Sequence, residues 1–103
     1  MARELMMVGN VGRLMAGKMM RVEVGGRRVL LANVNGRICA MDDTCSHEDA
    51  SLSTGSLSGE IVKCPLHGSR FNVCTGQVMD EPADCNLRTY RVMLDGDQIL
   101  VEI

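Results

Sequence analysis

Two short pairs of cysteine and histidine are the residues of this chain whose types and spacing could do chemistry. Cys45 and His47 stand in "CSH", and Cys64 and His67 stand in "CPLH". They form the pattern C-x-H-x16-C-x2-H, and the two histidines are the only ones in the sequence. Thiolate and imidazole together favour zinc, copper or an iron–sulfur cluster. The doubled pairing therefore predicts one metal centre held by two separate loops.

Three interpretations of the pattern remain open at the level of residue types. In the first, the cysteines are small buried apolar residues and the histidines lie on the surface. In the second, all four residues bind a structural zinc ion, although the single residue between Cys45 and His47 is tighter than the usual zinc spacing. In the third, the cysteines bind one iron and the histidines bind the other iron of a Rieske 2Fe–2S centre.

The wider segments resemble one family. "CSHEDASL" and "CPLHGSRFNVCTG" resemble the two cluster-binding loops of Rieske proteins, and nearly the whole chain resembles the Rieske ferredoxins of bacterial aromatic-ring dioxygenases, such as carbazole and biphenyl dioxygenase. The resemblance implies one 2Fe–2S cluster with Cys45 and Cys64 on one iron and His47 and His67, through Nδ1, on the other. It also implies a Rieske fold with a proline-containing third loop around Pro82.

The positions around the ligands predict a low reduction potential. In high-potential Rieske proteins an extra cysteine in each loop forms a disulfide, and the matching residues here are Ala50 and Leu66. A tyrosine that donates a hydrogen bond to a ligand sulfur is matched by Phe71, which we expect in the core beneath the loop. Because such donors raise the potential, their loss predicts about −150 mV. Ser69 either donates to the cluster or is a solvated turn residue.

The elements that must position these loops read as short strands. Apolar stretches at 18–24, 27–34, 37–41, 89–94 and 98–103 are separated by turn signals such as Gly25-Gly26, Asn35-Gly36 and Asp95-Gly96-Asp97. A helical turn is expected near 11–15. Within residues 42–86 only 59–64 and 70–73 read as strands. We predict a single all-β domain over 1–103, an antiparallel sandwich or small barrel with a cluster-binding subdomain inserted at about 42–86.

Composition excludes several functions. The 103-residue chain has two aromatic residues and a net charge of −2, which argues against nucleic-acid binding. It has no apolar stretch of membrane-spanning length and no signal-peptide pattern, so we expect a cytoplasmic protein that does not bind a membrane. Its five cysteines are then expected as thiols. The three outside the ligand set, Cys39, Cys74 and Cys85, are expected as structural residues, with Cys85 the one open to oxidation.

A fully ligated cluster has no open position for substrate, so we expect an electron carrier and not an enzyme. Both histidines are committed, which leaves none for a mononuclear iron site, and the sequence has no dinucleotide-binding glycine motif. The predicted role is transfer of one electron at a time from an NAD(P)H-dependent flavin reductase to the terminal oxygenase of an aromatic-ring dioxygenase. The alternatives are a small Rieske subunit of a nitrite reductase or another oxidoreductase, and a zinc-stabilised binding module.

Transient docking of a monomer is expected at the cluster tip. Glu48, Asp49, Leu66 and Pro82 are the residues expected to form the docking face. Seven carboxylates of the site segment form either an acidic rim that steers the chain toward basic partners or an ordinary solvated surface. They are Asp42, Asp43, Glu48, Asp49, Asp80, Glu81 and Asp84.

Overall fold

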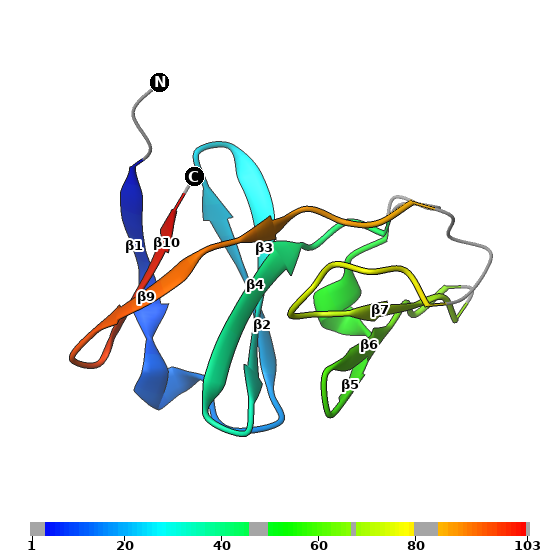
Figure 1. Cartoon of the computed structure of the whole chain (residues 1–103), viewed down its shortest axis with the longest axis horizontal. Helices are drawn as coiled ribbons and strands as arrows, with labels where there is room; N and C mark the ends of the chain where they lie inside the picture. The colour runs from blue at the N-terminus through cyan, green and yellow to red at the C-terminus, as the bar shows by residue number, and fades with distance from the viewer. Residues whose placement is uncertain (1–3, 46–49, 67, 80–84, 103) are drawn as a thin grey trace.

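Antiparallel hairpins with tight turns build most of the structure, a computed structural model that describes residues 4–45, 50–66, 68–79 and 85–102 (Figure 1). The elements in chain order are β1 (Leu5–Asn10), η1 (Val11–Arg13), β2 (Met19–Val24), β3 (Arg27–Val34), β4 (Arg37–Asp42), η2 (Leu52–Thr54), β5 (Ser56–Ser58), β6 (Ile61–Lys63), β7 (Arg70–Asn72), β8 (Thr89–Tyr90), β9 (Val92–Asp95) and β10 (Gln98–Glu102), where η marks a 3-10 helix. The predicted all-β class is confirmed.

The turn between β3 and β4 forms as its sequence predicts. Asn35 and Gly36 have φ of 53° and 94°, a region that asparagine and glycine enter at low cost. This turn pairs Val34 with Arg37 and fixes the register along the hairpin, so that Ala32 lies opposite Cys39. The predicted helical turn also forms, as η1, where the Asn10 side chain accepts a hydrogen bond from the Gly12 amide.

Two sheets form the base of the molecule. One has the strand order β1-β10-β9 and the other β2-β3-β4-β8. Side chains from both sheets, together with Leu14 after η1, fill a buried apolar core between them. The sheet residues of this core are Val24, Val29, Leu31, Ile38, Ala40, Tyr90, Ile99 and Val101. On β3, Val29 and Leu31 point into this core, whereas Leu30 and Ala32 belong to a second one. Strand β3 is thus buried on both faces, which explains its unbroken apolar run.

The insert lies at one end of the base and carries a third sheet of order β5-β6-β7 (Figure 1). Its buried residues join Leu30, Ala32, Cys39 and Met41 of the base sheet in a single apolar cluster; they are Cys45, Ala50, Leu52, Val62, Cys64, Phe71 and Val73. The insert therefore packs on the outer face of β3 and β4. This continuity fixes the cysteine-bearing loops relative to the base.

Three details of the strand prediction are wrong. The run 89–94 is not one strand, because the chain leaves β8, which pairs with β4, and enters β9, which pairs with β10. Strands β1 and β5 were not predicted. Strand β1 pairs with β10 at the other end of the chain, through a register shift between Met7 and Gly9.

No helix among the described residues has the length and apolar character needed to cross a membrane.

Candidate iron–sulfur centre

The first cysteine loop begins directly after β4. Cys45 is 4% exposed, and its amide donates a hydrogen bond of 3.0 Å to the Ala50 carbonyl. A bridge between Thr44 and Ser51 lies immediately outside this bond, so the two ends of the loop run antiparallel. Residues 46–49, which include the predicted ligand His47, lie outside the described residues.

The second cysteine loop joins β6 to β7 and closes in the same way. Cys64 is 2% exposed, and its amide donates a hydrogen bond of 2.7 Å to the Ser69 carbonyl. The Gly68 amide donates back to the Cys64 carbonyl at 3.2 Å. Gly68 has φ of 77°, where a side chain would be strained, which explains the glycine at this turn. His67 lies outside the described residues.

The two loops share one kind of closing backbone hydrogen bond. In each loop the amide of a buried cysteine donates a hydrogen bond to the carbonyl five residues later. Cys64 directly follows β6, and Cys45 lies three residues after the end of β4. Cys45 and Cys64 lie in the same apolar cluster, and neither takes part in a disulfide. The structure thus brings the two predicted sulfur ligands into one buried region. The positions of the two histidine ligands stay predictions.

A buried carboxylate that the sequence prediction did not assign supports the first loop. Asp43 is fully buried, and its side chain accepts hydrogen bonds from the Ser53 amide at 2.9 Å and from the Ser51 hydroxyl. Its backbone carbonyl accepts from the Leu52 amide at 2.7 Å. Asp43 therefore ties the start of the loop to the residues that follow it. The signal available in the sequence was an aspartate eight and ten residues before two serines, which is not specific.

Residues near the loops can be compared with their predicted places. Phe71 is fully buried in the cluster that contains both cysteines, as predicted. Ser69 is also fully buried, so the interpretation as a solvated turn residue is wrong. Leu66 is 60% exposed at the tip of the second loop, and Ala50 is 9% exposed at the end of the first. The exposure of Leu66 agrees with its predicted place in a docking face.

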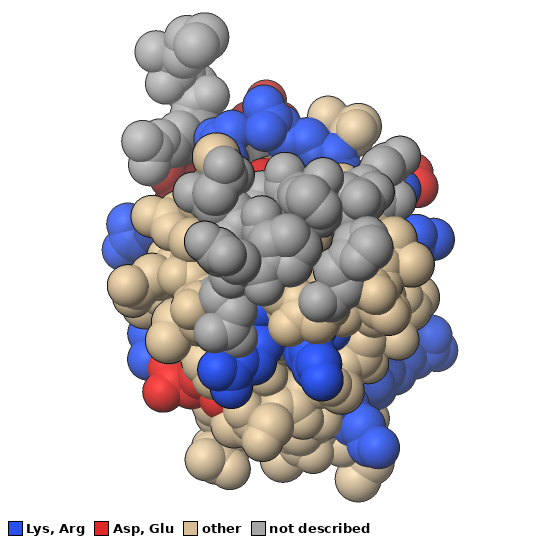
Figure 2. Space-filling model, turned by 90° about the vertical axis from the view of Figure 1, so that its right-hand side faces the viewer, with Lys and Arg blue, Asp and Glu red and all other residues tan. Residues whose placement is uncertain are grey.

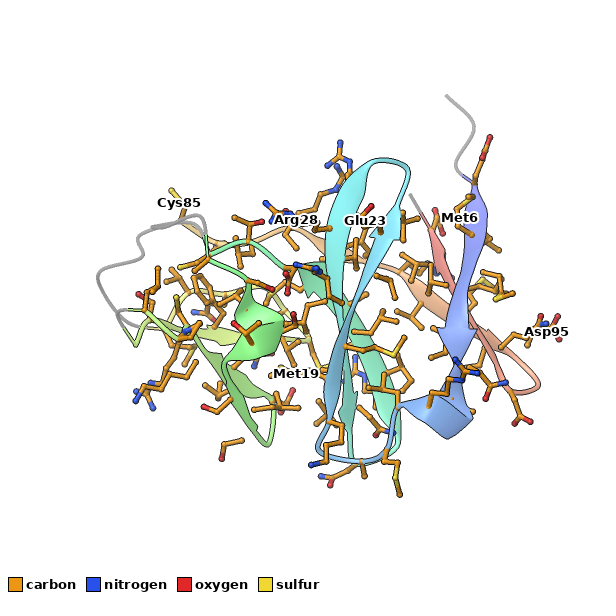
Figure 3. All side chains as sticks on the ribbon, turned by 180° about the vertical axis from the view of Figure 1, so that it is seen from behind. Met6, Met19, Glu23, Arg28, Cys85 and Asp95 are labelled. Atoms are coloured by element: carbon orange, nitrogen blue, oxygen red, sulfur yellow. A yellow bond between two sulfur atoms is a disulfide. The ribbon has the colours of Figure 1, made fainter. Side chains whose placement is uncertain are left out.

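Two cysteines outside the ligand set form a disulfide, which corrects the expectation of separate thiols. Cys39 on β4 and Cys74 after β7 are joined, with 5.1 Å between their Cα atoms. Only the fold brings these positions together, since β7 packs over the outer face of β4. Cys85 is exposed near the end of the insert, and its side chain points away from the molecule (Figure 3).

Charge at the tip differs in part from the acidic-rim hypothesis. Asp43 is buried, and Asp42 is partly buried and accepts a hydrogen bond from the Tyr90 hydroxyl, so neither belongs to an exposed rim. The other five carboxylates of the proposed rim lie outside the described residues. Lys63 and Arg70, paired on β6 and β7, are exposed there, and Figure 2 shows Lys and Arg side chains on this end of the molecule.

The donor set fits a cluster with mixed ligands. Cys45 and Cys64 supply two thiolates in a buried, apolar setting, and each loop carries one histidine within three residues of its cysteine. Within the described residues no group of three or more His, Cys, Asp and Glu side chains gathers as a metal site, because both histidines fall outside them. Two thiolates with two imidazoles on separate loops match the 2Fe–2S ligation in which histidines replace two cysteines on one iron.

Known proteins share both the sequence and the fold. The ferredoxin component of biphenyl 2,3-dioxygenase from Rhodococcus jostii (strain RHA1) is 45% identical over 92 residues, covering 89% of this chain and 86% of the relative. The ferredoxin of carbazole 1,9a-dioxygenase from Nocardioides aromaticivorans IC177 has a TM-score of 0.90 at 32% identity and covers 94% of this chain and 95% of its own.

Two further solved structures bear on the alternatives. A chain from the complex of reduced oxygenase and oxidized ferredoxin in carbazole 1,9a-dioxygenase has a TM-score of 0.89 at 34% identity, covering 94% of this chain and 91% of its own. A protein described as a nitrite reductase (NADPH) small subunit has a TM-score of 0.79 at 26% identity, covering 95% and 97%. Residues 4–91 match the family described as the Rieske 2Fe-2S domain, and this chain belongs to that family.

Proposed function

We propose that the chain carries single electrons from an NAD(P)H-dependent flavin reductase to the terminal oxygenase of an aromatic-ring dioxygenase, in the cytoplasm. The observation that carries this proposal is that Cys45 and Cys64, each at the start of a loop closed by the same kind of backbone hydrogen bond, are buried in one apolar cluster. The relatives support the same role, because biphenyl and carbazole dioxygenase ferredoxins resemble this chain over most of its length.

We assign the ligands from the residues of the two loops. Cys45 and Cys64 hold one iron, and His47 and His67 hold the other. The bound cluster supplies a centre that gains and loses one electron. The protein contributes the apolar burial of both thiolates, the backbone bonds that close each loop, and the Asp43 carboxylate that ties the first loop to η2.

The docking surface is assigned to the tip of the second loop. Pro65 and Leu66 are exposed there, immediately beside the proposed ligands Cys64 and His67. An apolar side chain at the tip gives a partner a small contact that excludes water near the cluster, which suits a complex that must form and dissociate quickly. One tip can serve the reductase and the oxygenase in turn.

Reconstitution of a three-component system tests the role. Purified protein should contain two irons and two sulfides per chain, show the reduced-state EPR signal of mixed histidine and cysteine ligation, and support saturable product formation by a biphenyl-type oxygenase with its reductase. A colourless protein with one zinc would refute the cluster. A cluster-containing protein that supports no oxygenase but forms a stable complex with a nitrite reductase large subunit would favour the alternative role, for which the likeness to the small subunit speaks.

Matched leucine variants test the docking surface. Leu66→Gln removes the exposed apolar contact at the tip, and Leu94→Gln makes the same change on β9, where Leu94 is 52% exposed. We expect Leu66→Gln to raise the ferredoxin concentration at half-maximal turnover about threefold to tenfold, the loss typical of one interface side chain. Leu94→Gln should leave it unchanged. Equal effects of the two variants, with both visible spectra intact, would place the docking surface elsewhere.

A further inference from the structure

The Cys39–Cys74 disulfide lies in an open groove whose chemistry is suited to thiol exchange. The groove has a volume of about 560 Å³ and lies where β4, β8 and β9 meet the turn after β7. Both cysteines line it, together with Tyr90 and two arginines. Of the described residues that line the groove, the charged ones are Arg37 and Arg91, so its walls carry positive charge only.

Both arginines line the groove together with Cys39. Arg37 and Cys39 are two residues apart on β4 and therefore share a face of the sheet. Arg91 directly follows β8, whose last residue, Tyr90, pairs with Ala40, and it lines the same groove as Cys39. A negative charge that develops on the Cys39 sulfur would thus form in a groove lined by two guanidinium groups, which would stabilise it.

The two cysteines differ in exposure. Cys39 is 6% exposed, whereas Cys74 is only partly buried, in a turn held by hydrogen bonds from the Cys74 and Thr75 amides to the Asn72 side chain. An incoming thiolate reaches Cys74 more easily, and access helps to decide which sulfur of a disulfide is attacked. Attack on Cys74 makes Cys39 the leaving group, and Cys39 shares a face of β4 with Arg37.

We propose that this groove is a thiol-exchange site at which a small thiol bearing an anionic group opens the Cys39–Cys74 disulfide. The thiolate attacks Sγ of Cys74 and forms a mixed disulfide, while the bond between the two protein sulfurs breaks and Cys39 leaves as a thiolate with the electron pair. A second molecule of the thiol attacks the first and releases Cys74, which yields one small-molecule disulfide and two protein thiols. Two small thiols are oxidised and one protein disulfide is reduced.

Opening the bond would release a covalent tie around the cluster site. The disulfide spans 35 positions of the chain, and this segment contains both predicted ligand loops. It joins β4 of the base sheet to the turn that follows β7 in the insert. With the disulfide formed, a covalent link between Cys39 and Cys74 holds the insert to the base in addition to packing. With the disulfide open, this link is lost and the packing remains.

The test compares three thiols of similar size and different charge on the cluster-containing protein at low salt. The probes are mercaptoethanesulfonate, 2-mercaptoethanol and cysteamine, and opening is followed by alkylation and mass spectrometry, with rates expressed per thiolate. We expect the anionic probe to open the disulfide about threefold to tenfold faster than the cationic one, because the arginines concentrate anions in the groove. Arg91→Gln should remove most of that ratio, and Arg21→Gln, at an exposed arginine on β2, should preserve it.

Three results would overturn the proposal, each independent of electron transfer. The first is complete alkylation of Cys39 and Cys74 in protein purified in air, which would mean that no disulfide forms. The second is a ratio of rates that is the same in the unmodified protein and in Arg91→Gln. The third is a trapped adduct of mercaptoethanesulfonate found on Cys39 and not on Cys74. An adduct on Cys74 together with a lower ratio in Arg91→Gln would support it.

Discussion

Replacing Asp43 tests whether a buried carboxylate holds the first ligand loop. In Asp43→Ala the Ser53 amide and the Ser51 hydroxyl lose their acceptor in a largely buried setting. Hydrogen bonds to a charged group contribute about 1.5–3 kcal/mol each. Allowing for the partial exposure of the serines, we expect the loop to open about 3 kcal/mol more easily. In Asp43→Asn an amide oxygen still accepts from Ser53 and the serine hydroxyl can turn to accept, so the expected loss is about 1 kcal/mol.

Local opening is the quantity to measure, because it does not require reversible unfolding of a cluster protein. Hydrogen exchange of the peptide 50–57 reports it, and loss of the visible cluster band to a chelator reports its effect on the site. A loss of about 3 kcal/mol corresponds to about 150-fold faster exchange, and 1 kcal/mol to about fivefold. Asp95→Asn, at an exposed end of β9, serves as the control. Asparagine and alanine variants of Asp43 with equal effects, or an alanine variant no faster than the control, would refute the role.

Three further predictions follow from single positions. Phe71→Tyr should raise the reduction potential from its expected value near −150 mV by about 40–60 mV, which is the equivalent of one hydrogen bond of about 1–1.4 kcal/mol to sulfur. Spectroelectrochemistry measures this potential, and an unchanged or lower value would contradict the prediction. Gly76→Ala should lower the melting temperature by more than about 12 °C, because its Cβ would lie 2.0 Å from the Leu87 carbonyl oxygen. Gly59→Ala has a similar backbone strain, at φ of 60°, but its Cβ would meet open space, so it should lower the melting temperature by only about 5 °C. Similar losses in the two variants would contradict this prediction. Burial and the hydrogen bond to a neighbouring carboxylate raise the pKa of Tyr90 in the folded protein, so its contribution to stability should be present below pH 10 and vanish as the pH rises through the higher folded pKa. Urea midpoints between pH 9 and pH 12 should therefore fall more steeply than in Tyr90→Phe.

The features that local chemistry determines were predictable from sequence. Asn35-Gly36 fixes a turn and hence the pairing of β3 with β4, and each cysteine loop reveals its ligands through neighbours two or three residues away. Strand β1 was missed because it pairs with β10 at the far end of the chain. Strand β5 was missed because three residues, two of them serine, show too little alternation to recognise.

Contacts between distant elements account for what the sequence did not reveal. The spacing of Cys39 and Cys74 does not indicate a bond, and the insertion of a β-hairpin subdomain on the outer face of β4 is what brings them together. The same applies to Asp43, which appears in the sequence as one more carboxylate of an acidic segment. In the structure Asp43 is buried, and its carboxylate accepts hydrogen bonds that hold the first loop.

The two ligand loops share one kind of closing backbone hydrogen bond but are held by different contacts. Variants in the two loops should therefore differ in how cluster retention is related to stability. The first loop is held through the Asp43 side chain, so a change of one carboxylate can loosen it without disturbing a strand. The second loop is the end of the β6–β7 hairpin, held by main-chain pairing and by a close approach in which a Cβ on Gly55 would lie 2.0 Å from the Lys63 carbonyl. Damage there must unpair the hairpin and expose Val62 and Phe71, which are fully buried. Loss of the cluster at nearly native stability should therefore arise from changes around the first loop, whereas changes under the second should lower cluster retention and melting temperature together.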